Sequence, residues 1–167
     1  MLALTGTLAL LTACSTEAST TTASSDVSTT EATVESTLIS DSSYSESNST
    51  AITFSDQTIT VDGSGAAADG SILTITQPGT YILSGTLSEG QVRVETVDEA
   101  DVQIVLDGAT ITNSTGAAIY VKSANSATIT LAEGTTNTLS DGEIYTFEDS
   151  EDEPDATLFS KSDLILN

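Results

Sequence analysis

The feature that most constrains the fold is a series of short alternating runs that begins at about residue 51. Each run places β-branched or other apolar residues at every second position, as in Thr58–Val61 and Gln91–Val94. Pairs of turn residues, such as Asp62-Gly63 and Asp107-Gly108, separate the runs. Period-two runs between such pairs predict β-strands, and no stretch has convincing helical periodicity. We therefore predict an all-β domain over residues 51–167.

Two segments of this region recur further along the chain. Residues 102–113 resemble residues 127–137, and residues 117–123 resemble residues 156–162. Self-similarity of this kind is typical of a solenoid, in which similar units lie side by side on successive coils. A β-sandwich also has short strands at regular spacing, but the very short connections and the many outward Ser, Thr and Asn residues favour a solenoid. We predict a parallel β-helix of roughly five coils.

The charge balance excludes several classes of function. The chain has 25 acidic and three basic side chains, no His and one Cys, for a formal net charge of -22. Without a basic surface, nucleic-acid binding is excluded, and without His there is no Ser-His-Asp triad and no His-ligated transition metal. The three cations are Arg93, Lys122 and Lys161. Arg93 lies close in sequence to Glu95 and Asp98, and we interpret it as part of a surface ion pair.

The N-terminus has the pattern of a bacterial lipoprotein signal. Residues 1–14 form an apolar run that ends in Leu11-Thr12-Ala13-Cys14, which matches the lipobox. We predict a signal peptide over residues 1–13 and lipidation of Cys14, which would anchor the protein at the extracellular face of the cell membrane. The alternative is a buried Cys in an N-terminal strand. Because no Lys or Arg precedes the apolar run, we expect the natural start to lie further upstream.

Residues 14–50 have the composition of a flexible linker. Ser and Thr dominate, six acids are scattered among residues 15–50, and no basic residue, Gly or Pro occurs there. Such a segment buries too little apolar surface to offset the entropy cost of ordering, so we predict a disordered tether between the anchor and the folded domain.

The densest chemical signal is the segment 141–155, which holds eight of the 25 acids and separates the two similar units at 117 and 156. Ca²⁺ takes six to eight oxygen ligands in flexible geometry and would relieve the repulsion between these carboxylates. The spacing does not match an EF-hand, and a solvated acidic loop is the alternative. The candidate Ca²⁺ ligands are Asp141, Asp149, Glu151, Asp152, Glu153 and Asp155.

A second candidate site combines aromatic rings with the rare lysines. Tyr120 and Lys122 alternate with aliphatic residues, and so share the outward face of their predicted strand. Phe159 and Lys161 occupy the same positions in the matching unit. On neighbouring coils these four residues would form a strip that offers ring faces to sugars and ammonium groups to uronate carboxylates. The alternative is that the lysines pair with the acidic loop and the rings cover a groove.

The chain resembles a known family across residues 51–167. The resemblance lies in several segments in constant order, among them ITFSDQTITVDGSG, GTYILSGTLSEGQVRVE, VQIVLDGATITNSTGAAIYVKSA, LAEGTTNTLSDG and EDEPDATLFSKSDLILN. They are similar to secreted carbohydrate-binding proteins of clostridial and related bacteria. The resemblance implies a right-handed parallel β-helix that binds calcium and acidic plant polysaccharide such as polygalacturonate, with some cellulose binding. It also implies a C-terminally incomplete domain, because the family continues with further coils.

These observations favour a non-catalytic, cell-surface lipoprotein that binds acidic polysaccharide with calcium. Two alternatives stay open. A calcium-dependent β-helix lyase would need a strong base beside metal-binding carboxylates, and Lys122 or Lys161 near the acidic loop could imitate that arrangement. A structural surface adhesin or stalk would have no specific sugar ligand, and fold alone does not decide between these functions.

Overall fold

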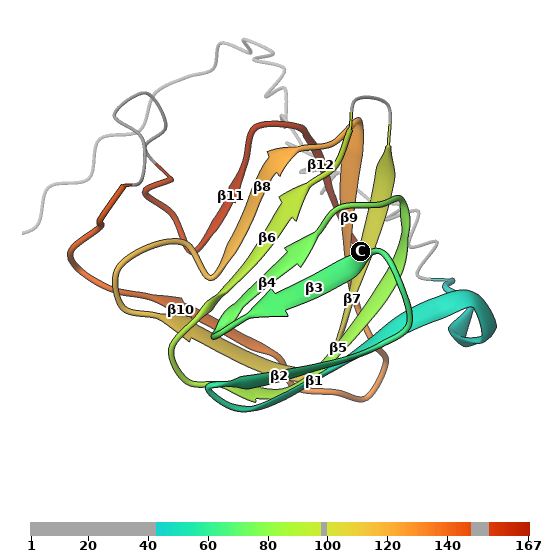
Figure 1. Cartoon of the computed structure of the whole chain (residues 1–167), viewed down its shortest axis with the longest axis horizontal. Coiled ribbons are helices and arrows are strands. Elements are labelled where there is room, and N and C mark those ends of the chain that lie inside the picture. The colour runs from blue at the N-terminus through green and yellow to red at the C-terminus, as the bar shows by residue number, and fades with distance from the viewer. Residues whose placement is uncertain (1–42, 98–99, 148–153) are drawn as a thin grey trace, which may run out of the picture. The chain divides into compact units, whose positions relative to one another are not determined.

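The computed structural model describes residues 43–97, 100–147 and 154–167 (Figure 1). Apart from one short 3-10 turn, η1 (Glu46–Asn48), every regular element in these residues is a β-strand, as the alternating runs predict. In the same residues, no helix is long and apolar enough to span a membrane. The predicted signal peptide, Cys14 and the linker as far as residue 42 lie outside the described residues.

In chain order, the strands are β1 (Ser49–Asp56), β2 (Thr58–Asp62), β3 (Ala66–Asp69), β4 (Ile72–Ile75), β5 (Gly79–Leu87), β6 (Gln91–Glu95), β7 (Asp101–Asn113), β8 (Ile119–Ser123), β9 (Ser126–Leu131), β10 (Thr138–Asp141), β11 (Leu158–Ser160) and β12 (Asp163–Leu166). They form two sheets. The first has the order β12-β9-β7-β5-β1-β2, with β10 also paired to β7, and the second has the order β11-β8-β6-β4-β3.

Nearly all strand pairs are parallel, which confirms the predicted β-solenoid. Both repeats have the predicted register, since Val102 pairs with Ala127 and Ile119 pairs with Leu158. Similar units of sequence therefore lie on neighbouring coils, and each strand of a coil extends a sheet begun by the previous coil. Figure 1 shows β11, β8, β6 and β4 side by side in this order.

The prediction of roughly five coils is wrong, because the regular solenoid has about three turns. Tyr81, Ile104, Ile129 and Leu166 occupy equivalent positions in one sheet, and each step between them is one turn. Before them, β1 pairs with β2 and β3 pairs with β4 in antiparallel hairpins. Only one residue joins β1 to β2 and only two join β3 to β4, and a parallel crossover needs a much longer connection.

β7 bends so that its two halves belong to different faces of the coil. Its first half pairs with β9, and its second half pairs with β10. The bend falls at Asp107-Gly108, where Gly108 has φ +73°. The neighbouring β5 bends at Gly85, which has φ +86° and at which the register between the two strands shifts. Glycine is well suited to these corners because it adopts positive φ without a steric penalty.

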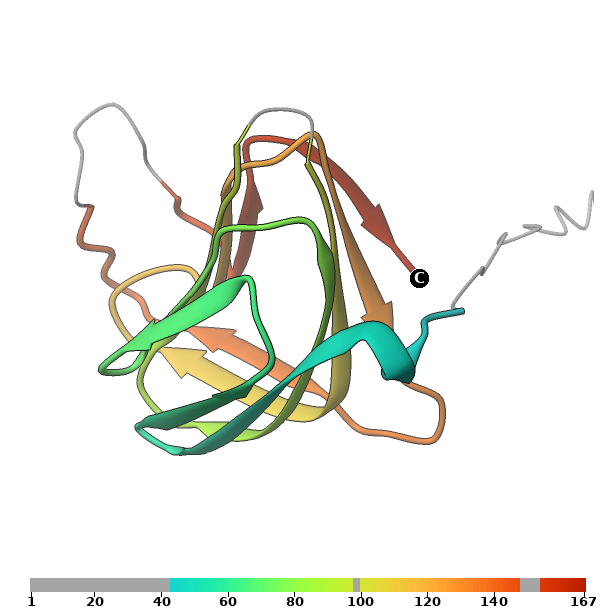
Figure 2. The ribbon, with the colours of Figure 1, turned by 45° about the vertical axis from the view of Figure 1, so that its right-hand side comes forward.

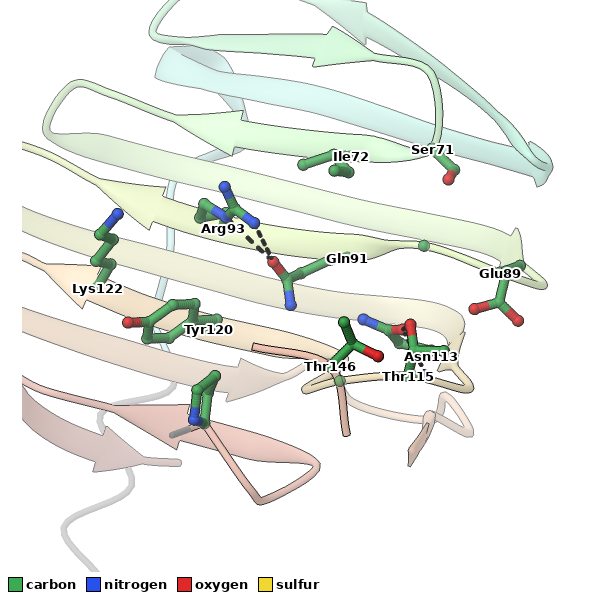
Figure 3. A pocket seen from close by; sticks show the side chains of 13 residues that line it. Ser71, Ile72, Glu89, Gln91, Arg93, Asn113, Thr115, Tyr120, Lys122 and Thr146 are labelled. Carbon is green, nitrogen blue, oxygen red and sulfur yellow. Dashed lines mark hydrogen bonds between the residues drawn. The ribbon is translucent and has the colours of Figure 1, made fainter. Parts of the chain in front are cut away.

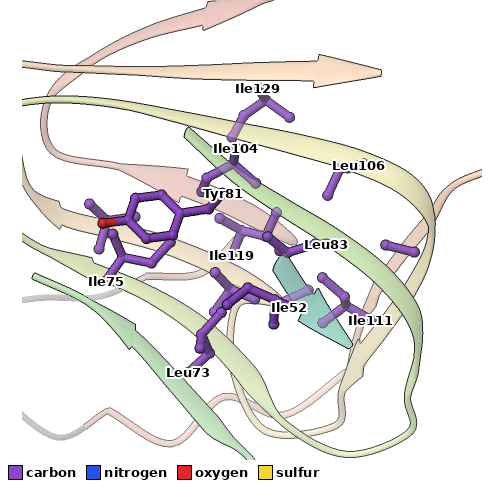
Figure 4. Close-up of a cluster of buried hydrophobic side chains, with 14 of the residues drawn as sticks. Ile52, Leu73, Ile75, Tyr81, Leu83, Ile104, Leu106, Ile111, Ile119 and Ile129 are labelled. Atoms are coloured by element: carbon purple, nitrogen blue, oxygen red, sulfur yellow. The ribbon is translucent and has the colours of Figure 1, made fainter. Parts of the chain in front are cut away.

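Figure 2 shows the coils from the side, and the interior that they enclose is filled by columns of apolar side chains (Figure 4). One column consists of Leu73, Val92 and Ile119, which are fully buried and hydrogen-bonded in register. On the opposite sheet, the ring of Tyr81 is buried beside Ile104, and its hydroxyl donates to the Gln77 carbonyl at 2.8 Å. Burial raises the pKa of Tyr81. Because side chains alternate along a strand, the residues between these apolar ones face outward, and they include the polar groups of the groove.

Candidate functional site

A groove of about 240 Å³ lies on the outer face of the second sheet (Figure 3). Its floor is formed by outward residues of β6 and β8, one end by the corner that follows β7, and one wall by residues of the acidic segment that follows β10. The lining residues are Ser71, Ile72, Glu89, Gly90, Gln91, Arg93, Asn113, Thr115, Gly116, Tyr120, Lys122, Thr146 and Pro154.

The register of β6, β8 and β11 brings the outward rings and cations together. Arg93 pairs with Tyr120, and Tyr120 pairs with Phe159. The rings of Tyr120 and Phe159 meet edge to face, with their centroids 5.7 Å apart. The predicted alignment of aromatic beside aromatic is therefore confirmed. The Tyr120 side chain is only 6% exposed, so it forms part of the groove floor and does not project into solvent.

Two of the three cations of the chain share one carboxylate at the cationic end of the groove. The Glu95 Oε1 atom lies 3.8 Å from Arg93 Nη1 and 3.5 Å from Lys122 Nζ. The Arg93 side chain is 16% exposed and the Lys122 side chain 37% exposed. The predicted ion pair of Arg93 with Glu95 is therefore present, and the Arg93 side chain is largely enclosed where an open surface position was expected.

A network of side-chain amides fixes the orientation of Arg93. The Gln91 Oε1 atom accepts hydrogen bonds from Arg93 Nε at 3.1 Å and from Arg93 Nη2 at 3.0 Å (Figure 3). The other end of the same amide, Gln91 Nε2, donates to the Ala117 carbonyl at 2.9 Å. Asn113 Nδ2 donates to this carbonyl as well, at 3.0 Å. Because Gln91 and Asn113 are buried, these bonds hold the guanidinium in one position.

The other end of the groove carries a carboxylate. Glu89 precedes β6, and its Oε1 atom accepts hydrogen bonds from the backbone N–H and from the hydroxyl of Ser114, both at 3.0 Å. Thr115 lies beside it, and the Thr115 hydroxyl donates to Asn113 Oδ1 at 3.3 Å. This end therefore has one acid and several neutral hydrogen-bonding groups.

The first part of the acidic segment packs against this corner and forms the wall of the groove. The Thr146 N–H donates to the Thr115 carbonyl at 2.7 Å. Gly142 lies so close to the corner that an added Cβ would be 1.7 Å from the Ser114 carbonyl oxygen. In the same segment, Tyr145 stacks on Phe147 with ring centroids 6.2 Å apart, and its hydroxyl donates to Asp141.

The candidate carbohydrate-binding residues divide between the groove and its border. Tyr120 and Lys122 line the groove, and Phe159 contacts Tyr120 on the next strand. The Lys161 N–H donates to the Val121 carbonyl at 2.9 Å, which places Lys161 beside Lys122 but outside the groove lining. Lys122 has part of each predicted role. Its side chain lines the groove, as the sugar-binding strip requires, but it also forms an ion pair, with Glu95 on β6 and not with the acidic loop.

Sequence reasoning missed Gln91, Asn113 and Glu89, and it predicted the ion pair of Arg93 but not its place in the groove. A signal for Arg93 was present, because Val92-Arg93-Val94 has the same apolar-polar-apolar pattern as Ile119-Tyr120-Val121, with which it pairs. No comparable signal marks Gln91 and Asn113, since their bonds converge on the carbonyl of a residue far from Gln91 in sequence.

Of the candidate calcium ligands, Asp141 and Asp155 are described, and Asp149, Glu151, Asp152 and Glu153 lie outside the described residues. Hydrogen bonds from Thr157 and Tyr145 hold the pKa of Asp141 below its usual value. The pKa of Tyr145 is raised, first by its bond to Asp141 and also by the charge of Asp155. Both carboxylates therefore act on the hydroxyl of Tyr145. Within the described part of the chain, no group of three or more Asp, Glu, Cys or His side chains could hold a metal ion.

Comparison with known proteins gives a consistent picture. The family model of carbohydrate-binding domain-containing proteins matches residues 69–167, which is more than half of the chain. A carbohydrate-binding domain-containing protein of Acetivibrio thermocellus is 39% identical over 93 residues, which are 55% of this chain and 32% of the relative. A solved structure of a polysaccharide lyase-like protein from C. thermocellum, in its gadolinium derivative, is 38% identical with a TM-score of 0.68.

The alignment with this solved structure includes 71% of the present chain and 48% of the other. The present chain thus spans about a third of the length of the curated relative and about half of the solved chain. The residues that the family model matches include β4, β6, β7 and β8, the strands that supply lining residues to the groove.

Proposed function

This chain belongs to the family of carbohydrate-binding domain-containing proteins, and we propose that it binds an acidic plant polysaccharide of the polygalacturonate class in the groove on the second sheet. Arg93 and Lys122 would bind a uronate carboxylate, and the hydroxyls and amides at the other end would bind the neutral parts of the sugar. Phe159 and Lys161 extend the same surface onto the next coil.

A single observation carries this proposal. In a chain with 25 acids and three bases, two of the bases line one groove beside a tyrosine ring. An oriented guanidinium is well suited to a carboxylate, because its planar donors match the two carboxylate oxygens. Neutral cellulose would make no use of this pair of cations.

We propose further that calcium supports this binding through the acidic segment 141–155. Asp141 and Asp155 supply hard oxygen donors of the kind that Ca²⁺ prefers, and the lowered pKa of Asp141 favours its charged form. Asp149, Glu151, Asp152 and Glu153 would complete the ligand set. Calorimetric titration of Ca²⁺ tests this, with the double variant Asp141→Asn, Asp155→Asn expected to lose affinity and Asp107→Asn, at an exposed turn, expected to keep it. Equal uptake by all three proteins would contradict the assignment.

Binding without catalysis fits the groove best. The name of the curated relative refers to carbohydrate binding, whereas the solved neighbour is called lyase-like. A lyase would need a base beside metal-binding carboxylates, but the carboxylate that Lys122 contacts is the single side chain of Glu95. Incubation with polygalacturonate and Ca²⁺ should give no increase in the ultraviolet absorbance of unsaturated products. A steady increase would establish the lyase instead, and a glycan array without chelator-sensitive binding would favour an adhesin or stalk.

The lipid anchor at Cys14 and the location at the extracellular face of the cell membrane also belong to this proposal. The Ser/Thr-rich segment that precedes η1 and β1 would then hold the groove away from the membrane. In a bacterial host, wild-type protein should remain with the membrane fraction, and Cys14→Ser should release it. Identical fractionation of the two proteins would argue against the anchor.

The decisive test of the groove removes one cation at a time. We expect Arg93→Gln to weaken binding of an oligogalacturonide most, because its guanidinium is the more enclosed cation, and Lys122→Gln to weaken it less. Lys161→Gln makes the same charge change at the border of this surface, outside the groove lining, and should weaken binding least. All effects should diminish as salt is added. Equal affinities of wild type and Arg93→Gln would refute the proposed site.

A further inference from the structure

The groove is electrically asymmetric along its length. Its charged lining residues, in the described part of the chain, are Glu89, Arg93 and Lys122. Figure 3 shows Glu89 at one end of the groove and Lys122 at the other. Four residue steps separate Glu89 from Arg93, which at the rise of a β-strand is a span of at most about 13 Å. A saccharide longer than a single ring would therefore meet both ends at once.

The carboxylate of Glu89 is fixed in this position. Both hydrogen bonds from Ser114 end on its Oε1 atom, and one of them comes from the backbone of the corner itself. The corner is in turn held by the amide of Asn113 and by the wall residue Thr146. Glu89 therefore cannot turn away from a bound ligand without breaking contacts that define the end of the groove.

The groups around Glu89 suit a neutral sugar. The hydroxyls of Thr115, Thr146 and Ser71 line the same end and can donate to or accept from sugar hydroxyls. Glu89 adds an acceptor for sugar hydroxyls, but it repels a second carboxylate. The cations lie at the other end of the groove and already share the carboxylate of Glu95, so they offset this repulsion only in part.

We infer that the groove prefers an acidic polysaccharide in which uronates and neutral sugars are neighbours to one that is an unbroken run of uronates. Glu89 is the residue that determines this preference. This inference rests on the proposed function and specifies its substrate class. One carboxylate binds at Arg93 and Lys122, and the neighbouring ring, without a charge, lies against Glu89. Specificity then comes from a repulsive group as much as from an attractive one.

The test compares two oligosaccharides with the same number of rings, one an oligogalacturonide and one in which galacturonate alternates with a neutral sugar. Both are titrated calorimetrically with the full chain at low salt and at one fixed Ca²⁺ concentration, so that any contribution of calcium is the same for the two ligands. Wild-type protein should bind the alternating oligosaccharide more tightly. Glu89→Gln should bind the oligogalacturonide on the order of tenfold more tightly than wild type does, with little change for the alternating ligand.

Glu89→Gln keeps an oxygen that can accept the two bonds from Ser114, and an unchanged unfolding midpoint would verify that the corner is intact. Glu133→Gln is the matched control, because Glu133 is exposed and does not line the groove. If Glu89→Gln leaves the ratio of the two affinities unchanged while Arg93→Gln weakens both ligands, the inference fails and the proposed function stands. If Arg93→Gln changes neither affinity, the proposed function itself fails.

Discussion

The corner glycine Gly85 provides a sharp test of the stacked-coil architecture. Gly85 has φ +86°, and a Cβ added to it would lie 2.2 Å from the carbonyl oxygen of Phe54, its partner on the neighbouring strand. Gly108 occupies the equivalent corner of the next coil with φ +73°, and an added Cβ there meets nothing within 4 Å. The two substitutions to Ala therefore share the cost of positive φ and differ in the clash.

The cost of each substitution follows from these geometries. An L-residue in the left-handed region costs roughly 1–2 kcal/mol, and both variants carry this term. Forcing extra atoms into a packed position costs about 1–3 kcal/mol more, because Phe54 and its strand must move. We expect Gly108→Ala to lower the free energy of unfolding by about 1–2 kcal/mol and Gly85→Ala to lower it by about 2–5 kcal/mol.

Urea unfolding of the two variants and of wild type, followed by circular dichroism in the β-sheet region, measures this difference. With a slope of roughly 1–3 kcal/mol per molar urea for a domain of this size, the midpoints of the two variants should be clearly separated. The slopes must also agree, because a change in slope would mean that the unfolded or native state had changed. Equal destabilisation by the two substitutions would refute the close packing of β1 on β5.

Three further predictions concern the groove and the coil edges. Glu95→Gln should tighten oligogalacturonide binding at low salt in a calorimetric titration, because Arg93 and Lys122 lose the carboxylate that they share; unchanged or weaker binding would show that Glu95 instead positions them. Gln91→Met should weaken the same binding and cost about 1–3 kcal/mol in a urea titration, because buried groups lose their partners; full affinity would contradict a positioning role. Asp101 accepts hydrogen bonds from Ser126 and Asn125 that lower its pKa, so its contribution to stability is present above the ordinary pKa of Asp and is lost as the pH falls through the lowered value. Asp101→Asn should therefore be less stable than wild type at pH 7 and equal to it in strong acid, and a pH-independent difference would refute this account.

The fold was largely predictable because neighbouring coils of the solenoid have similar sequences. The pairings of Val102 with Ala127 and of Ile119 with Leu158 follow directly from the similarity of the two pairs of segments. The hairpins of residues 49–75 were not predicted, because period-two alternation looks the same in parallel and antiparallel strands. Only the length of the connections distinguishes them, and the single residue Gln57 between β1 and β2 permits no parallel crossover.

The groove was predictable only where it repeats the pattern of the coils. Tyr120 and Phe159 could be aligned because their units are similar. The meeting of Gln91 and Asn113 could not be predicted, because Gln91 reaches the Ala117 carbonyl, to which Asn113 also donates, only across a turn of the solenoid. The strength of a solenoid as a scaffold has the same origin: it fixes the distances between strands and leaves the outward residues free to vary.

The three cations are dispersed in the sequence but concentrated in space. Arg93 lies on β6, Lys122 on β8 and Lys161 directly after β11, and these are consecutive strands of one sheet. Neighbouring strands lie about 4.8 Å apart, so like charges on them repel unless an anion lies between. Glu95 supplies that anion for Arg93 and Lys122. A uronate carboxylate has the same charge and similar geometry, so it can take over this role on binding. The groove is therefore kept intact, in the absence of ligand, by a side chain that imitates the chemical group it is proposed to recognise.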